Sequence, residues 1–499
     1  MLNYILILCI LFIGDNMFYR DKHFRIKIVL IVTLIIFLLM FIRIIYIQLF
    51  SYDKLNELAT SLWHRNLPIT ADRGRILDRN GKVLATNITT TTLYVVPNQI
   101  VDKEDTATKL SSILNVSYSD IYKHLTKRTS LEKVNPEGRQ LSSEVADKIN
   151  NLNIDGLYLM KESKRYYPYE EVLSHVLGYV GIDNQGLSGL ELKYDDYLMG
   201  KNGSIKYVSD GKGNRISGSE VYEQPQNGMD IYLTIDLDIQ LALEKELENV
   251  EAKYNPIESL AMVMDPNTGE ILAMGSSPTF DSNNYKNYNL ETINRNLPIW
   301  KNYEPGSTFK IITFASALNE NLFDMDQDTY YDKGYEIVGG ARIKSWKAGG
   351  HGLQTFRQVL MNSSNPGFVE IGRRLKKDKL YQYIQDFGLT KKTNIDLPGE
   401  SKGIMFDYDR FNEVEQATVA FGQGLSLTPL QLVRAISACI NGGYLYQPYV
   451  VDQIIDPKTK DIIYQTNPKM IKQVIKKETS LKMRDALESV VSEGGGKNA

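Results

Sequence analysis

Hydrophobic residues are unevenly distributed along the chain, and one early segment is almost entirely apolar. Residues 28–42 include a single polar residue and are flanked by Lys27 and Arg43. At about 1.5 Å per residue this run covers about 22 Å of helix, less than a hydrocarbon core of about 30 Å. It becomes a full span if it continues to Ile47 with the stem of Arg43 reaching toward the interface. A buried core helix is the alternative, but the segment offers no polar face, so we predict a transmembrane anchor at residues 24–47.

The charges around this segment predict its orientation. Four basic residues precede the span: Arg20, Lys22, Arg25 and Lys27. By the positive-inside rule, residues 1–23 are expected to be cytoplasmic and everything after about residue 48 to be exported. No small-residue cleavage site follows, so the anchor is expected to stay uncleaved. We also hypothesise that Met17 is the natural start and that residues 1–16 are a start-codon artefact.

Residues 50–228 show a mixed pattern that predicts an extended α+β region. Residues 76–84 read as a hairpin with Asn80 and Gly81 at the turn, because both tolerate positive φ. Threonine, valine and tyrosine dominate the next stretch, which is typical of strands. Helical periodicity is expected in two stretches, 106–114 and 142–150. The region has no evident active site, and we interpret it as a spacer or pedestal.

Residues 229–499 combine strand patterns with many helical ones. In chain order we predict a strand at 231–235, a helix capped by Asp236, strands at 259–264 and 270–276, helices at 308–318, 380–387 and 428–440, and a strand region at 454–464. The helix at 428–440 has Thr428 as its cap, Pro429 at its first position and a Gly-Gly stop. A pair of strands followed by many helices indicates an α/β or α+β fold.

Composition excludes several classes of protein. The chain has 499 residues, which suggests about three domains. Apolar residues make up 43% and charged residues 23%, which is typical of a globular chain and not of a disordered or many-span protein. The net charge of −3 lacks the basic excess usual for nucleic-acid binding. Two cysteines are too few for a disulfide framework or a cysteine-ligated metal.

The strongest chemical signal is Ser307-Thr308-Phe309-Lys310 at the start of an apolar helix. Unsatisfied N–H groups at a helix N-terminus favour negative charge developing near Ser307. Lys310 lies one turn further along on the same face. The helix is apolar enough to be central to a domain, so we expect Lys310 to be buried. A buried lysine with a lowered pKa can take the serine proton, which makes this a plausible nucleophile–base pair. The plain alternative is an N-cap serine with a solvated lysine, and the same spacing occurs elsewhere, at Ser51/Lys54, Ser130/Lys133 and Ser209/Lys212.

A second motif favours the nucleophile–base interpretation over the N-cap alternative. Ser363-Ser364-Asn365 lies just before a helix-like stretch at 368–375. A Ser-x-Asn loop there could offer Lys310 a second hydroxyl and hold a substrate peptide group with the amide. Ser282-Asn283-Asn284 has the same pattern but precedes the nucleophile, and the triplet alone is common.

Taken together, Ser307-x-x-Lys310 and Ser363-x-Asn365 resemble the active site of the serine-acylating penicillin-binding transpeptidases. The resemblance extends from the anchor to the last residue and is to class B of that family. It is carried by further segments: Arg73-Gly74-Arg75-Ile76-Leu77-Asp78-Arg79-Asn80-Gly81, Gly189-Leu190-Glu191, Asp265-Pro266-Asn267-Thr268-Gly269-Glu270-Ile271-Leu272-Ala273, His351-Gly352 and Phe421-Gly422-Gln423-Gly424.

The resemblance implies a fold: a membrane helix, an α+β pedestal or dimerisation domain at 50–228, and a penicillin-binding/β-lactamase-like transpeptidase domain with an antiparallel sheet and helices at 229–499. It also implies a reaction. Ser307 would attack the penultimate D-Ala carbonyl of a peptidoglycan stem peptide, with Lys310 as base, Ser363 as proton relay and Asn365 as the substrate-binding residue. An amine of a second stem peptide would resolve the acyl-enzyme, and β-lactams would acylate the same serine.

The family further implies partners: a glycan-polymerising membrane protein, but no nucleic acid, metal or other cofactor. The sequence has no HExxH or P-loop pattern. The family's third motif, a Lys-Thr-Gly or Lys-Ser-Gly triad, is absent from the chain, and Lys392-Thr393-Asn394 is the nearest match. In family members the triad follows Ser-x-Asn by more residues than remain here, so we expect a C-terminally truncated transpeptidase domain.

Three other functions fit parts of the pattern. A Ser-His-Asp hydrolase is disfavoured, because the five histidines are scattered and the Gly-x-Ser sites at Ser188 and Ser426 lack the final glycine of a nucleophile elbow. A β-lactamase or β-lactam sensor shares Ser-x-x-Lys, although the long exported region argues against a β-lactamase. A non-catalytic scaffold in wall synthesis is supported only by the missing triad. Within class B the sequence resembles the septal and sporulation-cortex subgroup, and it does not separate those two roles.

Overall fold

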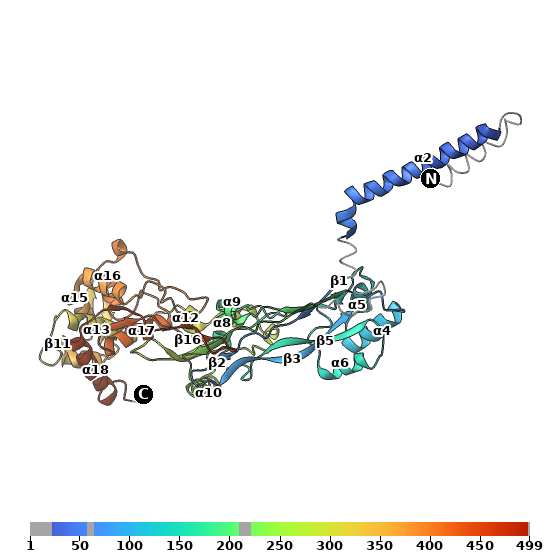
Figure 1. Ribbon diagram of the computed structural model, residues 1–499. Coiled ribbons are helices and arrows are strands. Elements are labelled where there is room, and N and C mark those ends of the chain that lie inside the picture. Colours follow the sequence, from blue (N-terminus) through green and yellow to red (C-terminus); the bar gives the residue numbers. More distant parts are fainter. Residues whose placement is uncertain (1–21, 57–63, 209–220, 498–499) are drawn as a thin grey trace.

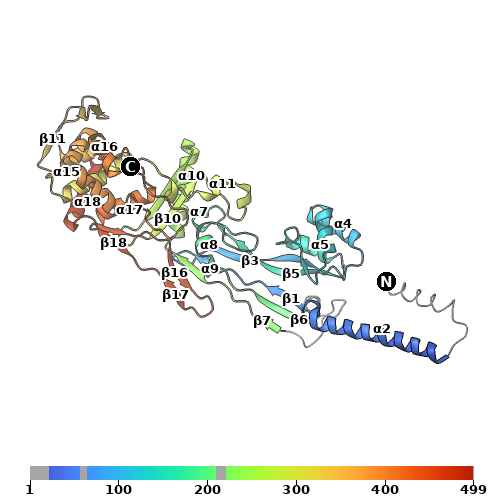
Figure 2. The ribbon, with the colours of Figure 1, turned by 90° about the horizontal axis from the view of Figure 1, so that it is seen from above.

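The structure is a computed structural model that describes residues 22–56, 64–208 and 221–497. Figure 1 shows an elongated molecule in which one long helix, a sheet-rich middle part and a helical lobe follow one another. Figure 2, the view from above, shows the same succession. The hypotheses about Met17 and residues 1–16, and most of the segment expected to be cytoplasmic, lie outside the described residues, as does Ser209/Lys212.

The long helix α2 (Lys22–Phe50) is the candidate membrane span. Its residues 26–50 form a 25-residue stretch that contains an 18-residue window with a mean hydropathy of 3.2, and no part of that window is buried inside the molecule. At about 1.5 Å per residue the stretch covers roughly 37 Å, enough to cross a hydrocarbon core. The helix continues through Arg43, whose guanidinium lies 5.6 Å from the centre of the Tyr46 ring. An apolar helix of this kind near the N-terminus suggests a membrane anchor.

A seven-stranded sheet runs along the middle of the molecule in the order β17-β16-β8-β2-β3-β4, with β5 paired to β3. Its strands are β2 (Ile76–Leu77), β3 (Val83–Val95), β4 (Glu132–Lys133), β5 (Leu157–Tyr166), β8 (Asp230–Leu233), β16 (Val451–Ile455) and β17 (Ile462–Gln465). Because β2 is antiparallel to β3 and parallel to β8, segments from before and after residue 228 share one sheet.

The predicted hairpin at 76–84 is present as the turn between β2 and β3. Only Gly81 of the two turn residues has a positive φ, +85°. The turn is closed instead by the carboxylate of Asp78, which accepts hydrogen bonds from the backbone N–H groups of Asn80 and Lys82 at 2.9 and 2.7 Å. The predicted hairpin is therefore confirmed. Its turn has one residue with a positive φ where the sequence suggested two, and the Asp78 side chain supplies hydrogen bonds that close it.

Helices and a small second sheet complete the pedestal. The helices are α4 (Lys103–Leu114), α5 (Tyr118–Thr126), α6 (Ser143–Asn150), α7 (Ser174–Leu177), α8 (Gly189–Lys193) and α9 (Asp195–Leu198). The second sheet has the order β1-β6-β7, with β1 (His64–Ile69), β6 (Gly203–Val208) and β7 (Val221–Glu223). Apolar residues of α4, α5 and α6 pack with those of β3 in one core. The sequence predicted α4 and α6 but not α5.

Two of the sequence motifs meet inside the pedestal in a buried ion cluster. Glu191 accepts from Nε of Arg73 at 2.6 Å and from Nε of Arg165 at 2.7 Å, and all three side chains are at most 1% exposed. Gly74, the residue after Arg73, packs against Met229, the residue before β8. It leaves no room for a side chain, because a Cβ there would lie 1.8 Å from the carbonyl oxygen of Met229. The Arg-Gly-Arg and Gly-Leu-Glu motifs therefore join distant segments of the chain.

The first helix and the first two strands after β8 are those that the sequence predicted. Asp236 caps α10 (Leu237–Tyr254) by accepting from two backbone N–H groups of its first turn. β9 (Ser259–Met264) and β10 (Ile271–Ser277) pair antiparallel, and Leu243 and Leu247 of α10 pack against Ala273.

The helical lobe surrounds α13 (Lys310–Asn319), eight of whose ten residues are buried. The helical segments after β10 are, besides α13, η1 (Tyr285–Asn287) and α11 (Leu290–Asn294), which pack toward Tyr179 of the pedestal, and then α12 (Leu297–Trp300), η2 (Gly306–Phe309), α14 (Phe356–Met361), α15 (Asn365–Asp386), η3 (Tyr408–Arg410), α16 (Glu413–Val419), α17 (Pro429–Ile440) and α18 (Lys477–Ser492). Short strands lie between them: β11 (Thr329–Asp332), β12 (Tyr335–Val338), β13 (Ala341–Lys344), β14 (Gly352–Thr355), β15 (Tyr444–Tyr446) and β18 (Met470–Gln473).

These elements give a mixed α+β fold, as predicted. α17 has the predicted Thr428 cap. The two helical stretches predicted at 368–375 and 380–387 belong to α15, which has a non-helical residue, Lys376, between them. The short strands β11 to β14 and the helix α18 were not predicted.

Candidate active site

Ser307 lies on a tight 3-10 turn, η2, that leads directly into α13. The sequence predicted one continuous helix from residue 308, so the first turn is narrower than expected. Gly306 allows the entry with a φ of +56°. Phe309 is fully buried while Ser307 is exposed, which fixes the turn and leaves the serine open to solvent. The N–H of Lys310 donates to the carbonyl oxygen of Ser307.

Lys310 is the first residue of α13 and is only 2% exposed. Its Nζ donates three hydrogen bonds, to the carbonyl oxygen of Ser363 at 2.8 Å, to Ser363 Oγ at 2.9 Å and to Asn365 Oδ1 at 2.7 Å. The ring of Phe368 lies 5.3 Å from Nζ. No carboxylate faces the ammonium among these contacts, and burial lowers the pKa of Lys310 from 10.5 to about 7. The structure therefore brings Lys310, Ser363 and Asn365 together beside the turn that carries Ser307.

The loop that holds Ser363 is strained and tightly supported. Ser363 has a φ of +50°, a conformation that costs a residue with a side chain about 1–3 kcal/mol. Ser364 caps α15 by accepting from the N–H of Gly367 at 3.1 Å. It also donates to Oδ2 of Asp332 at 2.8 Å. Asp332 is fully buried at the end of β11 and was missed by the sequence reading, because an Asp-Lys-Gly turn signal does not reveal which distant loop it will hold.

A glycine-rich loop lies against the Ser307 turn. The N–H of Gly306 donates to the carbonyl oxygen of Gly422 at 2.9 Å, and Tyr303 and Leu427 exchange two backbone hydrogen bonds. A Cβ on Gly422 would lie 2.0 Å from the Gly306 carbonyl oxygen. The N–H of Gly424 donates to Glu304 at 3.0 Å. The Phe-Gly-Gln-Gly motif thus holds the turn that carries Ser307.

A third loop reaches the site from β13 and β14. Nε1 of Trp346, which is 69% exposed, donates to the carbonyl oxygen of Asn362 at 2.8 Å. Its ring meets His351 edge-on at 5.3 Å between centroids. Burial lowers the pKa of His351, so its imidazole is mostly neutral at pH 7. The His-Gly motif therefore lies next to the Ser363 loop, and Trp346 is a neighbour that the sequence reading did not name.

The competing motifs lie elsewhere. Lys54 is exposed, and Lys133 pairs with Glu162 at 2.7 Å. Asn283, from the other Ser-x-Asn triplet, binds the backbone of Tyr167. Among the described residues, no group of three or more His, Cys, Asp or Glu side chains could hold a metal ion.

Comparisons with known proteins agree with this architecture. Residues 259–499 match the penicillin binding protein transpeptidase domain, and residues 68–233 match the penicillin-binding protein dimerisation domain. Stage V sporulation protein D of Bacillus subtilis (strain 168) is 50% identical over 95% of this chain and 74% of its own length. Peptidoglycan D,D-transpeptidase FtsI of Escherichia coli (strain K12) is 30% identical over 91% of this chain and 75% of its own length.

The fold has counterparts among solved structures as well. Penicillin binding protein 2X from Streptococcus thermophilus superposes with a TM-score of 0.67 and 25% identity. The superposition covers 85% of this chain and 66% of that one.

A mixed α+β fold with a buried lysine beside a serine turn and a Ser-x-Asn loop defines a penicillin-binding transpeptidase. The comparisons place the chain in the same group, and it belongs to the class B penicillin-binding proteins, the family of the peptidoglycan D,D-transpeptidases. The resemblance noted in the sequence is confirmed.

Proposed function

We propose that the chain cross-links peptidoglycan stem peptides through an acyl-enzyme on Ser307. The observation that carries this proposal is the environment of Lys310. Burial without a carboxylate partner brings its pKa to about 7, so a large fraction of the amine is neutral near physiological pH and can accept a proton. Ser307 is the exposed hydroxyl one turn before it.

The hydrogen bonds of Lys310 suggest how the proton moves. Three donated bonds require the ammonium form, because a neutral amine has two N–H groups and one lone pair. Of the three acceptors only Ser363 Oγ can reverse its role and donate. In the neutral state the Ser363 hydroxyl therefore donates to Nζ, and this hydrogen bond provides a path from Lys310 to the leaving amine.

The remaining roles follow from the same contacts. Ser307 Oγ attacks the carbonyl carbon of the penultimate D-Ala, its proton passes to Lys310, and Ser363 protonates the departing D-Ala amine. Asn365 has its Oδ1 engaged by Lys310, so its Nδ2 is left to bind a substrate peptide carbonyl. The backbone N–H of Ser307, in the first turn of a helix, supplies one donor to the developing oxyanion. An amine from a second stem peptide then takes the acyl group, while a β-lactam leaves a stable ester.

The setting of this reaction is also proposed. The four basic residues before the apolar helix favour a cytoplasmic N-terminus and an extracytoplasmic site. Class B membership favours a partner that polymerises glycan strands in the same membrane. Co-purification of the full chain with such a membrane protein, and protease protection of residues before α2, test these two statements.

Covalent labelling with a fluorescent penicillin tests the central proposal. We expect the full chain to retain the label after denaturation and Ser307→Ala to retain none. Ser282→Ala, which alters the other Ser-x-Asn triplet, is the matched control and should label like the wild type. Label on Ser307→Ala at the wild-type level would show that another residue is acylated. Labelled wild-type protein that fails to join stem peptides would favour a sensor over a transpeptidase.

A further inference from the structure

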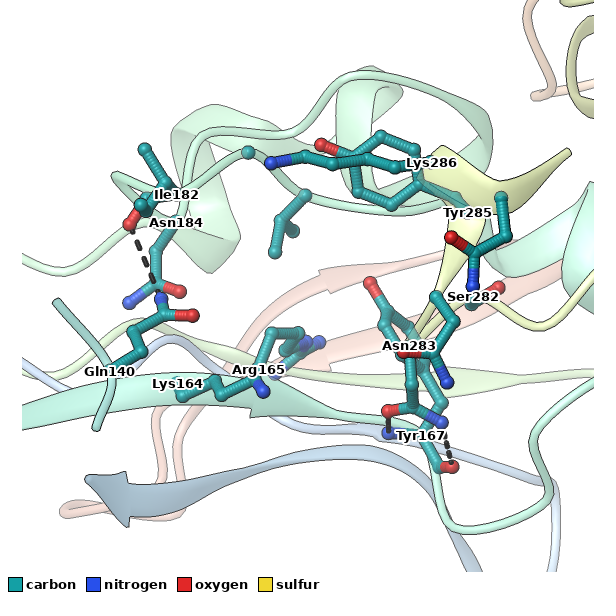
Figure 3. A pocket seen from close by; sticks show the side chains of 14 residues that line it. Gln140, Lys164, Arg165, Tyr167, Ile182, Asn184, Ser282, Asn283, Tyr285 and Lys286 are labelled. Carbon is teal, nitrogen blue, oxygen red and sulfur yellow. Dashed lines mark hydrogen bonds between the residues drawn. The ribbon is translucent and has the colours of Figure 1, made fainter. Parts of the chain in front are cut away.

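A cavity of about 260 Å³ lies outside the Ser307 site, where the end of β5 meets the loop before α11. Figure 3 shows Lys164 and Arg165 on one side of it and Tyr285 and Lys286 on the other. Its walls come from the pedestal and from residues 282–287 of the region matched by the transpeptidase domain. A ligand in this cavity would contact both parts of the chain.

The cavity is positively charged. Three of its described lining residues are cationic, Lys164, Arg165 and Lys286, and none is acidic. Neither lysine has an ion-pair partner among the residues that the structure describes. Arg165 donates its Nε to Glu191 and its Nη1 to the carbonyl oxygen of Gly74. Its Nη2 has no hydrogen-bond partner, and the Arg165 side chain is only 1% exposed.

Two more buried polar atoms around the cavity lack partners, Ser282 Oγ and Asn184 Oδ1. Buried polar groups in native proteins are nearly always satisfied, by protein, water or ligand. The cavity is far larger than the volume of about 30 Å³ that one molecule occupies in liquid water. Asn283 holds the wall in place through two 3.0 Å hydrogen bonds with the backbone of Tyr167. The cavity therefore has a fixed wall beside its two lysines.

We propose that this cavity binds a small carboxylate ligand that also carries hydroxyl or amide groups. The ammonium groups of Lys164 and Lys286 suit a carboxylate, and the asparagine and glutamine side chains of the lining suit hydroxyl and amide groups. The ring of Tyr285, which stacks on Tyr179, provides an apolar surface for the rest of the ligand. A sugar acid and an acidic peptide share this chemistry. The proposal does not depend on the role of Ser307.

Isothermal titration of the detergent-solubilised full chain tests the proposal with four probes. N-acetylmuramic acid represents a sugar acid, the dipeptide L-Ala-γ-D-Glu represents an acidic peptide, and N-acetylglucosamine and acetate are the neutral-sugar and bare-anion comparisons. We expect at least one of the first two to bind at least tenfold more tightly than either comparison probe. Which of the two binds identifies the source of the carboxylate.

Variants locate the binding. Lys286→Glu, at an exposed position, should weaken binding at least tenfold. Lys253→Glu on α10 makes the same charge change away from the cavity and should leave binding unchanged. Penicillin labelling of each variant checks that the chain is folded. Absence of binding by both acids, equal binding of acetate, or full binding by Lys286→Glu would each overturn the proposal.

Discussion

At the scale of residues, the site depends on one buried cation. The apolar helix after Ser307 allowed the sequence to predict that Lys310 is buried, and the Ser-x-Asn motif suggested Ser363 as its partner. The hydrogen bond from Lys310 to Asn365 was not predicted. The sequence could not predict that Ser363 takes a positive φ or that Asp332 supports Ser364, because both depend on loops that meet only after folding. Spacing along a helix can be read from a chain, whereas contacts between loops cannot.

The lowered pKa of Lys310 predicts a pH dependence of acylation. Because the neutral amine accepts the proton, the second-order rate constant for penicillin acylation should rise with pH through about 7 and level off above it. Lys310→Arg keeps a charge that cannot be removed, so we expect a loss of about 10²–10⁴-fold at every pH. Stopped-flow measurement with a chromogenic β-lactam gives both results.

Lys133→Arg is the matched control for this change. Lys133 has the same spacing from a serine but pairs with Glu162, so its replacement should leave the rate and the pH profile unaltered. A flat profile between pH 6 and 9 for the wild type would contradict the role of Lys310 as the base.

At the scale of elements, capping signals account for two of the helices that were predicted. α10 and α17 have side-chain caps at Asp236 and Thr428, and both were predicted. α18 has Lys476 at its N-cap without a side-chain hydrogen bond, so the sequence contains no start signal for it. α5 does have a cap at Ser117, a signal that our sequence reading did not use. The strands β11 to β14 are four residues each, too short for alternation to be recognised.

The contact between the Gly422 loop and the turn of Ser307 predicts an effect of one added methyl group. In Gly422→Ala the Cβ meets the Gly306 carbonyl oxygen at 2.0 Å, and φ is +85°. Gly399→Ala has nearly the same φ, +84°, with nothing within 4 Å of its Cβ, so it measures the backbone cost alone. We expect Gly399→Ala to cost about 1–2 kcal/mol and Gly422→Ala about 1–3 kcal/mol more.

Urea unfolding measures both costs, and penicillin labelling separates the two variants further. Gly422→Ala should slow acylation because it displaces the Ser307 turn, while Gly399→Ala should not. Equal labelling rates for the two would show that the glycine loop does not position Ser307.

At the scale of the whole molecule, the pedestal and the helical lobe are joined by shared structure. β2 and β3 pair with β8, and β8 pairs with β16, a strand from near the end of the described chain. The sequence showed a change of pattern near residue 228 but could not show this pairing, because strand partners distant in sequence leave no local signal. The pedestal and the part of the chain after residue 228 therefore share one hydrogen-bonded sheet.

The buried ion cluster at Glu191 predicts how strongly the parts are coupled. Glu191→Gln leaves two guanidinium groups, each about 1% exposed, without their shared carboxylate. Removing one partner of a buried ion pair typically costs about 3–5 kcal/mol. If the shared sheet couples the two parts, this loss lowers the stability of the entire region that follows α2, so one cooperative thermal transition should move down as a unit. Glu223→Gln removes an exposed pair with Lys206 and should shift the midpoint little. Two separate transitions, with only the lower one shifted in Glu191→Gln, would mean that the pedestal unfolds independently and that the sheet does not transmit its stability to the site.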